Sequence, residues 1–213
     1  MAKQKGIIKL DGTIGGITFY KTTEDGYLAR EKGGVSADKI ANDPAFQRTR
    51  ENGEEFGRAG KAGKLLRNSI RAMLQNASDS RMVGRLTQKM VEVIQEDLTN
   101  PRGQRNVIDG EAELLEGFEF NISGKLGTTL YAPFTGTIDR VAGTLTVNIP
   151  AFVPINMLAA PGGATHFKIV SAGAEVDFEN ETFVIDTQAT AVLPWDSAAT
   201  AVINLINAVT ANS

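Results

Sequence analysis

Gly-Glu-Glu-Phe-Gly-Arg-Ala-Gly-Lys-Ala-Gly-Lys, residues 53–64, lies in the middle of the chain, and the rest is organised around it. Apolar and small residues recur on either side at spacings of three and four, from Phe46 to Leu74, which predicts one face of a helix. Asn42 or Asp43 can cap the first turn and Pro44 suits the first helical position. These residues predict a helix that begins near Pro44 and runs through the glycine-rich stretch.

Four glycines in one helix call for an explanation, because each costs about 0.8–1 kcal/mol relative to alanine. Glycine lets a neighbouring backbone or a large side chain come close. We therefore predict that this helix packs closely against another helix, within one subunit or between subunits. The alternative interpretation is a loop over residues 53–63 between two shorter helices. The predicted packing face consists of Gly53, Phe56, Gly57, Gly60 and Gly63.

A phosphate-binding loop is excluded at this position. The motif requires a glycine, four further residues, and then Gly-Lys-Ser/Thr. Glu55 stands where the first glycine belongs for one alignment, and Arg58 stands there for the other. Leu65 also replaces the hydroxyl residue that would bind magnesium.

A second helix is predicted over residues 82–98. Ser78 or Asp79 can cap it, and Asn100-Pro101 ends it. Its apolar residues recur at helical spacing, so we interpret them as core residues. The two helical segments predict a helical hairpin with its bend at residues 76–78. The apolar stripe is Met82, Val83, Leu86, Met90, Val93, Ile94 and Leu98.

The net charge of −3 hides an asymmetry between the two halves of the chain. Residues 1–106 carry 19 lysines and arginines against 13 acidic residues, whereas residues 107–213 carry 3 against 12. Halves of opposite sign favour either head-to-tail association of copies or a basic surface for nucleic acid. The residues predicted to contact nucleic acid in that alternative are Arg48, Arg50, Arg58, Lys61, Lys64, Arg67 and Arg71.

Short strands are predicted at the amino terminus, over residues 6–10, 16–20 and 27–30. Asp11-Gly12 and residues 24–26 are the predicted turns between them. Tyr20, Tyr27, Lys9, Lys21 and Arg30 offer an aromatic and basic surface for single-stranded nucleic acid. We favour the interpretation that they are ordinary aromatic residues of a sheet.

The second half reads as a β-sandwich, immunoglobulin-like or jelly-roll-like, with strands that alternate at period two between turn residues. Residues 138–143 read as a hairpin turn. The final apolar run, 200–209, suits either a helix or a strand, and we favour a strand at a sheet edge, where another chain could pair with it. The remaining predicted strands are 117–122, 143–149, 165–170, 174–178 and 182–186.

No catalytic motif is present. The chain has no cysteine and a single histidine, His166, so a zinc site would need mostly carboxylates, and we interpret His166 as structural. The acidic residues 109–119 lack the spacing of a calcium loop and read as a solvated segment. We predict no cofactor, no metal site and no small-molecule substrate. No apolar run approaches membrane-spanning length and no signal peptide is apparent, which predicts a cytoplasmic protein or a particle assembled in the cytoplasm.

Three stretches carry a resemblance to a known group: residues 6–20, 43–52 (Asp-Pro-Ala-Phe-Gln-Arg-Thr-Arg-Glu-Asn) and 115–121 (Leu-Glu-Gly-Phe-Glu-Phe-Asn). Together they resemble a family of unknown function from Bacteroidetes and their phages and mobile elements. The resemblance implies a glycine-rich N-terminal hairpin, a helical middle and a C-terminal β domain. It also implies that members continue beyond the position of Ser213, and it carries no functional residues.

The sequence therefore predicts an α+β protein with a small N-terminal antiparallel sheet, a central helical hairpin and a C-terminal β-sandwich. The predicted domains are residues 1–106 and 107–213. The leading functional hypothesis is a non-enzymatic, self-assembling structural subunit, such as part of a phage-derived virion, tube or filament. The alternative hypothesis is a module that binds nucleic acid through its basic half.

Overall fold

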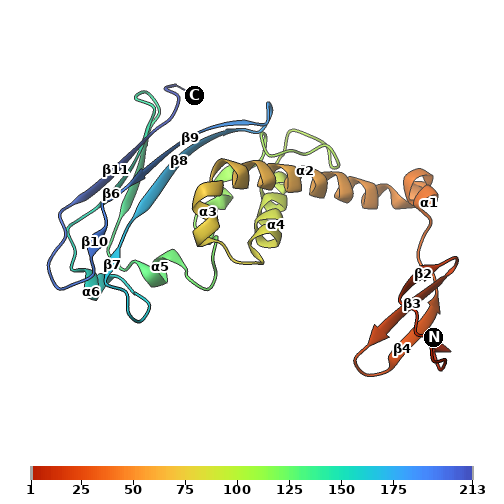
Figure 1. Cartoon of the computed structure of the whole chain (residues 1–213). Helices are drawn as coiled ribbons and strands as arrows, with labels where there is room; N and C mark the ends of the chain where they lie inside the picture. The colour runs from red at the N-terminus through yellow and green to blue at the C-terminus, as the bar shows by residue number, and fades with distance from the viewer. Residues whose placement is uncertain (1, 213) are drawn as a thin grey trace. The chain divides into compact units, whose positions relative to one another are not determined.

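The computed structural model describes residues 2–212 and shows a mixture of helix and strand, 31% and 27% of the chain (Figure 1). A long helix and several small antiparallel sheets make up the structure. The contacts divide the chain into two compact units, Met1–Arg50 and Glu51–Ser213, called here the N-terminal and C-terminal units. The sequence analysis places the boundary at 106/107 instead. The segment around that position packs onto the long helix, as described below, so contacts run across it.

The N-terminal unit contains a four-stranded antiparallel sheet in the order β1-β4-β3-β2. The prediction of a strand at residues 6–10 is wrong, because the β2–β3 hairpin turns at Gly15 and Gly16 and not at Asp11-Gly12. Gly15 has a φ of 58°, which glycine adopts without strain, so the two-glycine turn sets this register. The strands are β1 (Ala2–Lys3), β2 (Gly12–Ile14), β3 (Ile17–Thr22) and β4 (Gly26–Glu31).

Three helical segments follow the N-terminal sheet in the chain. Ser36 caps α1 (Ala37–Asn42) by accepting from the Lys39 backbone. The side chain of Asp43 caps the short 3-10 helix η1 (Pro44–Phe46), as its position before a proline predicts. Helix α2 (Gln47–Ser69) follows directly. Residues 53–63 are therefore helical, and the alternative of a loop there is wrong.

The predicted helical hairpin is present in the C-terminal unit. The polypeptide turns after α3 (Arg71–Ala77) and returns as α4 (Met82–Gln95). Ser78 and Asp79 do not cap α4 with their side chains at the N-cap position, which Arg81 occupies. The core between α2 and α4 is formed by Ala59, Ala62, Leu74, Met82, Leu86, Met90, Val93, Ile94 and Val107.

The predicted strand at residues 117–122 is wrong. The short 3-10 helix η2 (Ala112–Leu115) precedes this segment, whose aromatic rings pack onto the helical core. The rings of Phe118 and Phe120 meet edge to face at 5.0 Å, and Arg85 lies over Phe118 at 5.3 Å. Asp79 accepts a hydrogen bond from the Ile122 backbone, which keeps the segment on α4 and out of any sheet.

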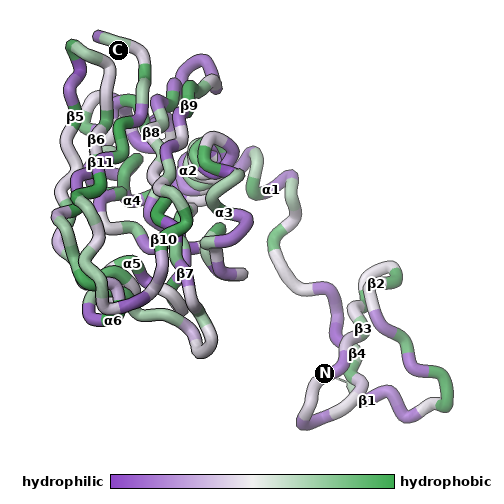
Figure 2. Tube along the Cα trace, turned by 60° about the vertical axis from the view of Figure 1, so that its left-hand side comes forward, coloured by the Kyte–Doolittle hydropathy of each residue, from purple (hydrophilic) through white to green (hydrophobic). Residues whose placement is uncertain are grey.

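A three-stranded antiparallel sheet, in the order β11-β6-β5, follows in the C-terminal unit. One face carries the apolar side chains of β6 with the buried Ile203 and Leu205 of β11, and the other carries mainly Thr and Asn. The strands of this sheet are labelled in Figure 2. The strand predicted for the last apolar run and its place at an edge are confirmed, as is the hairpin turn before Gly143. The strands are β5 (Thr135–Asp139), β6 (Thr144–Ile149) and β11 (Ile203–Ala208).

Short elements close the buried face of this sheet. Ile149, Phe152, Ile203 and Leu205 form its core with Leu130 and Ala132. The covering elements are the helices α5 (Leu126–Thr129) and α6 (Pro154–Met157) and the small strand pair β7 (His166–Phe167) and β10 (Leu193–Pro194).

A two-stranded ribbon, β8 (Val170–Asp177) and β9 (Thr182–Ala189), packs against β11. Gly173 permits this approach, because a Cβ there would lie 2.7 Å from the Cβ of Asn207. Asn207 is buried, and its amide donates to the carbonyl oxygens of Ser171 and Asp186. The ribbon thus contacts the sheet where Gly173 has no side chain and where Asn207 is hydrogen-bonded.

Candidate functional site

The glycine-rich face of α2 divides into a buried part and an uncovered part. Gly63 is buried, and a Cβ on it would lie 3.7 Å from side-chain atoms of both Leu86 and Met90. Gly63 therefore serves the packing of α2 on α4 within the subunit, one of the two packing roles the sequence predicts for this face.

The rest of the predicted packing face is uncovered. A Cβ added at Gly53, Gly57 or Gly60 would meet no atom within 4 Å among the residues described. The side chain of Phe56 lies among them and is 61% exposed. This uncovered set, Gly53, Phe56, Gly57 and Gly60, is named here the α2 outer face. Nothing in the subunit requires glycine at these three positions.

Alanine at all three outer-face glycines is expected to raise the free energy of unfolding by about 2–3 kcal/mol, because helix propensity improves and no clash arises. Leucine at Gly63 is expected to lower it by about 1–3 kcal/mol through overpacking against α4. Urea unfolding followed by circular dichroism measures both. A triple variant less stable than the parent would show that the outer face is packed in solution.

A buried ion pair anchors the loop after α4 onto α2. Glu55 is 3% exposed and accepts hydrogen bonds from Arg105 Nε at 2.8 Å, Arg105 Nη2 at 2.9 Å and the Gly103 backbone N–H at 2.8 Å. Hydrogen bonding from Arg105 lowers the pKa of the Glu55 carboxyl, against the opposing effect of burial. The pair joins residues fifty positions apart and holds α2 beside the loop that follows α4.

Asp97 fixes the conformation of the same loop after α4 through hydrogen bonds at the start of that loop. Its side chain, which is nearly inaccessible, accepts from the backbone N–H groups of Thr99, Asn100 and Asn106 and from the Asn100 side chain. Burial raises the pKa of Asp97, but the hydrogen bonds from Asn100 and Asn106 outweigh it and lower the pKa to about 2. The loop is thereby fixed by one carboxylate and not by regular secondary structure.

Stability of the C-terminal unit is expected to fall in acid. The pKa values of Glu55 and Asp97 are depressed in the folded chain, whereas unfolded carboxyl groups titrate near about 4. Their contribution is complete above that pH and is lost progressively as the pH falls toward about 2. Urea midpoints measured between neutral pH and pH values of about 2.5 test this. The variant Asp97→Asn should show a smaller loss on acidification, and an unchanged pH profile would contradict the assignment.

The seven basic residues predicted to contact nucleic acid differ in their surroundings. Arg48 and Arg50 belong to the N-terminal unit, where Arg50 donates to the carbonyl oxygens of Ile40 and Asp43. Arg67 is partly buried and lies beside Gly63, and its Nη1 finds no hydrogen-bond partner among the described residues. Arg71 is exposed on α3.

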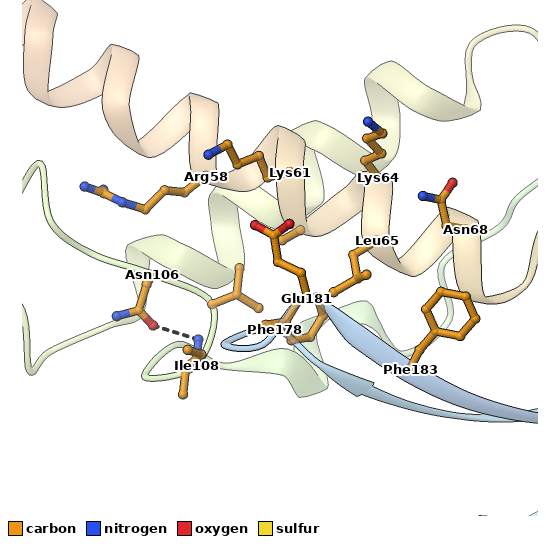
Figure 3. A pocket seen from close by; sticks show the side chains of 12 residues that line it. Arg58, Lys61, Lys64, Leu65, Asn68, Asn106, Ile108, Phe178, Glu181 and Phe183 are labelled. Carbon is orange, nitrogen blue, oxygen red and sulfur yellow. Dashed lines mark hydrogen bonds between the residues drawn. The ribbon is translucent and has the colours of Figure 1, made fainter.

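The other three, Arg58, Lys61 and Lys64, lie along one wall of a groove of about 570 Å³ (Figure 3). The opposite wall is the tip of the β8–β9 ribbon with its flanking residues, and the loop after α4 forms the floor. Figure 3 shows the carboxylate of Glu181 extending from that tip toward α2. The remaining lining residues are Ala62, Leu65, Asn68, Asn106, Val107, Ile108, Phe178 and Phe183.

The basic side chains of the groove differ in whether they have hydrogen-bond or ion-pair partners. Arg58 donates to the Arg105 carbonyl oxygen at 3.1 Å and lies 4.0 Å from Glu54. Within residues 2–212, neither Lys61 nor Lys64 makes a hydrogen bond or ion pair through its side chain. The wall opposite these lysines presents both the carboxylate of Glu181 and the ring of Phe183, which is 42% exposed.

Sequence analysis missed the ribbon side of this groove. Phe178, Glu181 and Phe183 come from a hairpin more than a hundred residues after α2 in the chain. Their period-two alternation predicts strands, but only the tertiary structure shows that the hairpin tip reaches α2.

The predicted aromatic and basic surface at the amino terminus is split between two faces of the sheet. Lys21 pairs with Tyr27 across β3 and β4, and its ammonium lies 5.5 Å from that ring. Tyr20 lies in the alternate register position, on the other face, where Arg30 lies 5.4 Å from its ring. Because adjacent residues of a strand point to opposite faces, the two tyrosines cannot form one stacking platform.

No group of three or more acidic or histidine side chains within residues 2–212 is placed to hold a metal ion. Across the same residues, no helix has the length and apolar character needed to cross a membrane. No family model, curated protein or solved structure matches the chain.

Proposed function

We propose that this chain is a non-enzymatic structural subunit that assembles with copies of itself in the cytoplasm. The kind of assembly we have in view is a phage-derived virion, tube or filament, in keeping with the family resemblance. Within this proposal the β8–β9 ribbon and the β11-β6-β5 sheet are the two layers of a C-terminal sandwich.

The observation that supports assembly most strongly is the amount of apolar surface left uncovered in a small sheet. Among residues 2–50, Leu28 is the only buried apolar side chain. Ile14 and Ile17 on the same sheet are 63% and 46% exposed. A few short strands need a packed apolar face to be stable in water, so this sheet calls for a partner surface.

The C-terminal unit supports the same proposal through its edges. Strands β5 and β11 are both edge strands of their sheet, and Ile138 on β5 is 66% exposed. The α2 outer face adds an exposed phenylalanine surrounded by glycines. Edges and apolar faces of this kind are the surfaces through which subunits associate.

Electron microscopy and light scattering of the nucleic-acid-free protein, at low and at physiological salt, test the proposal. Ordered rings, tubes or shells are expected. The variant Gly60→Leu should impair assembly if the α2 outer face is a contact, whereas Gly60→Ala should not. Because a Cβ at Gly60 would contact nothing within the described part of the subunit, either variant should fold normally. A monodisperse monomer at high concentration and low salt would refute self-assembly.

A second function, binding of single-stranded nucleic acid, is favoured by one observation. Lys61 and Lys64 are unpaired within residues 2–212, in a groove that also presents Phe183, and such proteins combine cationic grooves with aromatic side chains. Affinity should fall steeply with salt and should be lost in Lys61→Glu/Lys64→Glu. The control Arg71→Glu changes a charge outside the groove. No binding near 50 mM salt, or equal losses in the groove and control variants, would exclude this site.

A further inference from the structure

The strand register of the N-terminal sheet sorts its side chains into two unlike faces. Phe19 pairs with Ala29 in the middle of the two central strands, and Ile17 pairs with both Ile14 and Glu31. Partners opposite each other in an antiparallel pair share a face. The face that contains Phe19 is named here the Phe19 face, and it consists of Ala2, Ile14, Ile17, Phe19, Lys21, Tyr27, Ala29 and Glu31.

The other face is polar and has its apolar residue covered. It presents Thr18, Tyr20 and Arg30, and Leu28 on this side is only 4% exposed. The Phe19 face has the reverse character. Ile14 and Ile17 are largely exposed, and a shallow hollow lies beside them over Ala2 and Ala29. The apolar face of this sheet is thus the one that lacks a cover among the described residues.

The charges on the Phe19 face lie at opposite ends of the central strands. Lys21 is near the end of β3, whereas Glu31 ends β4 beside Ile17. The side chain of Glu31 makes no ion pair or hydrogen bond within residues 2–212. The ammonium of Lys9 lies at the Lys21 end as well, 5.9 Å from the ring of Tyr27. A surface with cations at one end and an anion at the other is complementary to a copy of itself turned end for end.

We propose that a second copy of this chain covers the Phe19 face, so that two N-terminal sheets stack face to face about a two-fold axis. Stacked sheets lie about 10 Å apart with interdigitated inner side chains, which would bury Ile14, Ile17 and Phe19 of both copies. Lys21 of each copy then faces Glu31 of the other. This contact rests on the proposed function, because it specifies one of the interfaces through which the subunit assembles.

The size of the contact determines how it should be measured. The strands lie about 4.8 Å apart and rise about 3.3 Å per residue, so the two six-residue central strands and the shorter β1 and β2 together present roughly 270 Å² per copy. Stable specific interfaces bury about 800 Å² per partner. The stacked sheets alone therefore form a transient dimer, which other contacts reinforce in the assembly. Crosslinking traps such a dimer, whereas dilution in a sizing experiment would dissociate it.

The chain contains no cysteine, so a single introduced thiol reports on one position. Ala29 and Arg30 are neighbours on β4 that point to opposite faces, and Arg30 is the more exposed. With a short bismaleimide crosslinker, full-length Ala29→Cys is expected to form a covalent dimer as the main product. Arg30→Cys is expected to form only a trace, although its thiol is more accessible to random collision.

Further variants separate the contact from misfolding. Ile17→Glu in the Ala29→Cys chain should abolish the covalent dimer. Lys21→Glu and Glu31→Lys should each reduce it, and their combination should restore it, because the exchanged charges again face each other. Equal crosslinking of the Ala29→Cys and Arg30→Cys chains, or no crosslinking of the Ala29→Cys chain, would overturn the stacked sheets. If the expected crosslinking fails but wild-type assemblies are seen by electron microscopy, the proposed function stands and only this interface is wrong. If neither the covalent dimer nor the assemblies are seen, the interface and the proposed function are both refuted.

Discussion

Alanine at Glu55 is expected to lower the free energy of unfolding of the C-terminal unit by about 3–5 kcal/mol, the usual cost of removing one partner from a buried ion pair. The change would leave Arg105, whose side chain is 18% exposed, without its carboxylate and would leave the Gly103 N–H without an acceptor. The loop after α4 would lose its attachment to α2. Urea unfolding at neutral pH, followed by far-ultraviolet circular dichroism, measures the loss.

Glu54→Ala provides the matched control one residue earlier on the same helix. The Glu54 side chain is 59% exposed and lies 4.0 Å from Arg58, so its removal should change stability by no more than about 0.5 kcal/mol. Equal effects at the two positions would show that the Glu55–Arg105 pair contributes no more than a surface pair.

Alanine at Leu86 is expected to destabilise the same unit by about 2–5 kcal/mol. Leu86 is completely buried in the centre of α4 and packs where Gly63 leaves room on α2. The substitution removes apolar contact and leaves a cavity in an interior that the backbone of α2 cannot easily fill. Thermal and urea unfolding monitored by circular dichroism should agree on the loss.

Val83→Ala on the same helix is the comparison. Val83 is 47% exposed, so its truncation should fall within about 0.5 kcal/mol of the parent. A Leu86 variant as stable as the Val83 variant would mean that α4 does not pack on α2 as described. Because both changes shorten an apolar side chain on α4, altered helix propensity cannot explain a difference of several kcal/mol.

Helical periodicity predicted the middle of the chain well. Met82, Leu86, Met90, Val93 and Ile94 of the predicted stripe are buried in the core, because a period of 3.6 places those positions on one face. The prediction of Val83 and Leu98 as core residues is wrong, since they are 47% and 92% exposed and Leu98 lies beyond the end of α4. Period-two alternation likewise predicted β6, β8, β9 and β11. Both signals are local, and both report burial directly.

Failures occurred where tertiary contacts override a local pattern. Residues 117–122 alternate like a strand, yet Phe118 and Phe120 pack onto α4 and no neighbouring strand among the described residues pairs with them. At the amino terminus, Asp11-Gly12 is a strong turn signal, but the Gly15-Gly16 turn gives the register that pairs Ile14 with Ile17. Local sequence could not rank the two turns, because the choice depends on the completed sheet.

The site was harder to predict than the fold. The α2 residues of the groove were identified from their charge, whereas the ribbon tip that faces them and the Glu55–Arg105 pair depend on contacts between distant segments. Nothing in the pattern around Glu55 distinguishes it from its exposed neighbour Glu54. Buried ion pairs of this kind become visible only when both partners are placed in space.

Strand β11 illustrates how the exposed edge of a sheet can be protected from uncontrolled addition of further strands. Its outer edge is partly closed by carboxylates of the ribbon, since Asp186 accepts from the Ala208 N–H and Glu175 accepts from the Thr210 N–H just beyond the strand. Hydrogen bonds from Gln188 and from the Ala208 backbone lower the pKa of Asp186, so this cover persists in mild acid. Strong acid would protonate Asp186 and leave the Ala208 N–H at this strand edge open to other chains. Purification and storage near neutral pH are therefore advisable before the electron microscopy that tests the proposed assembly.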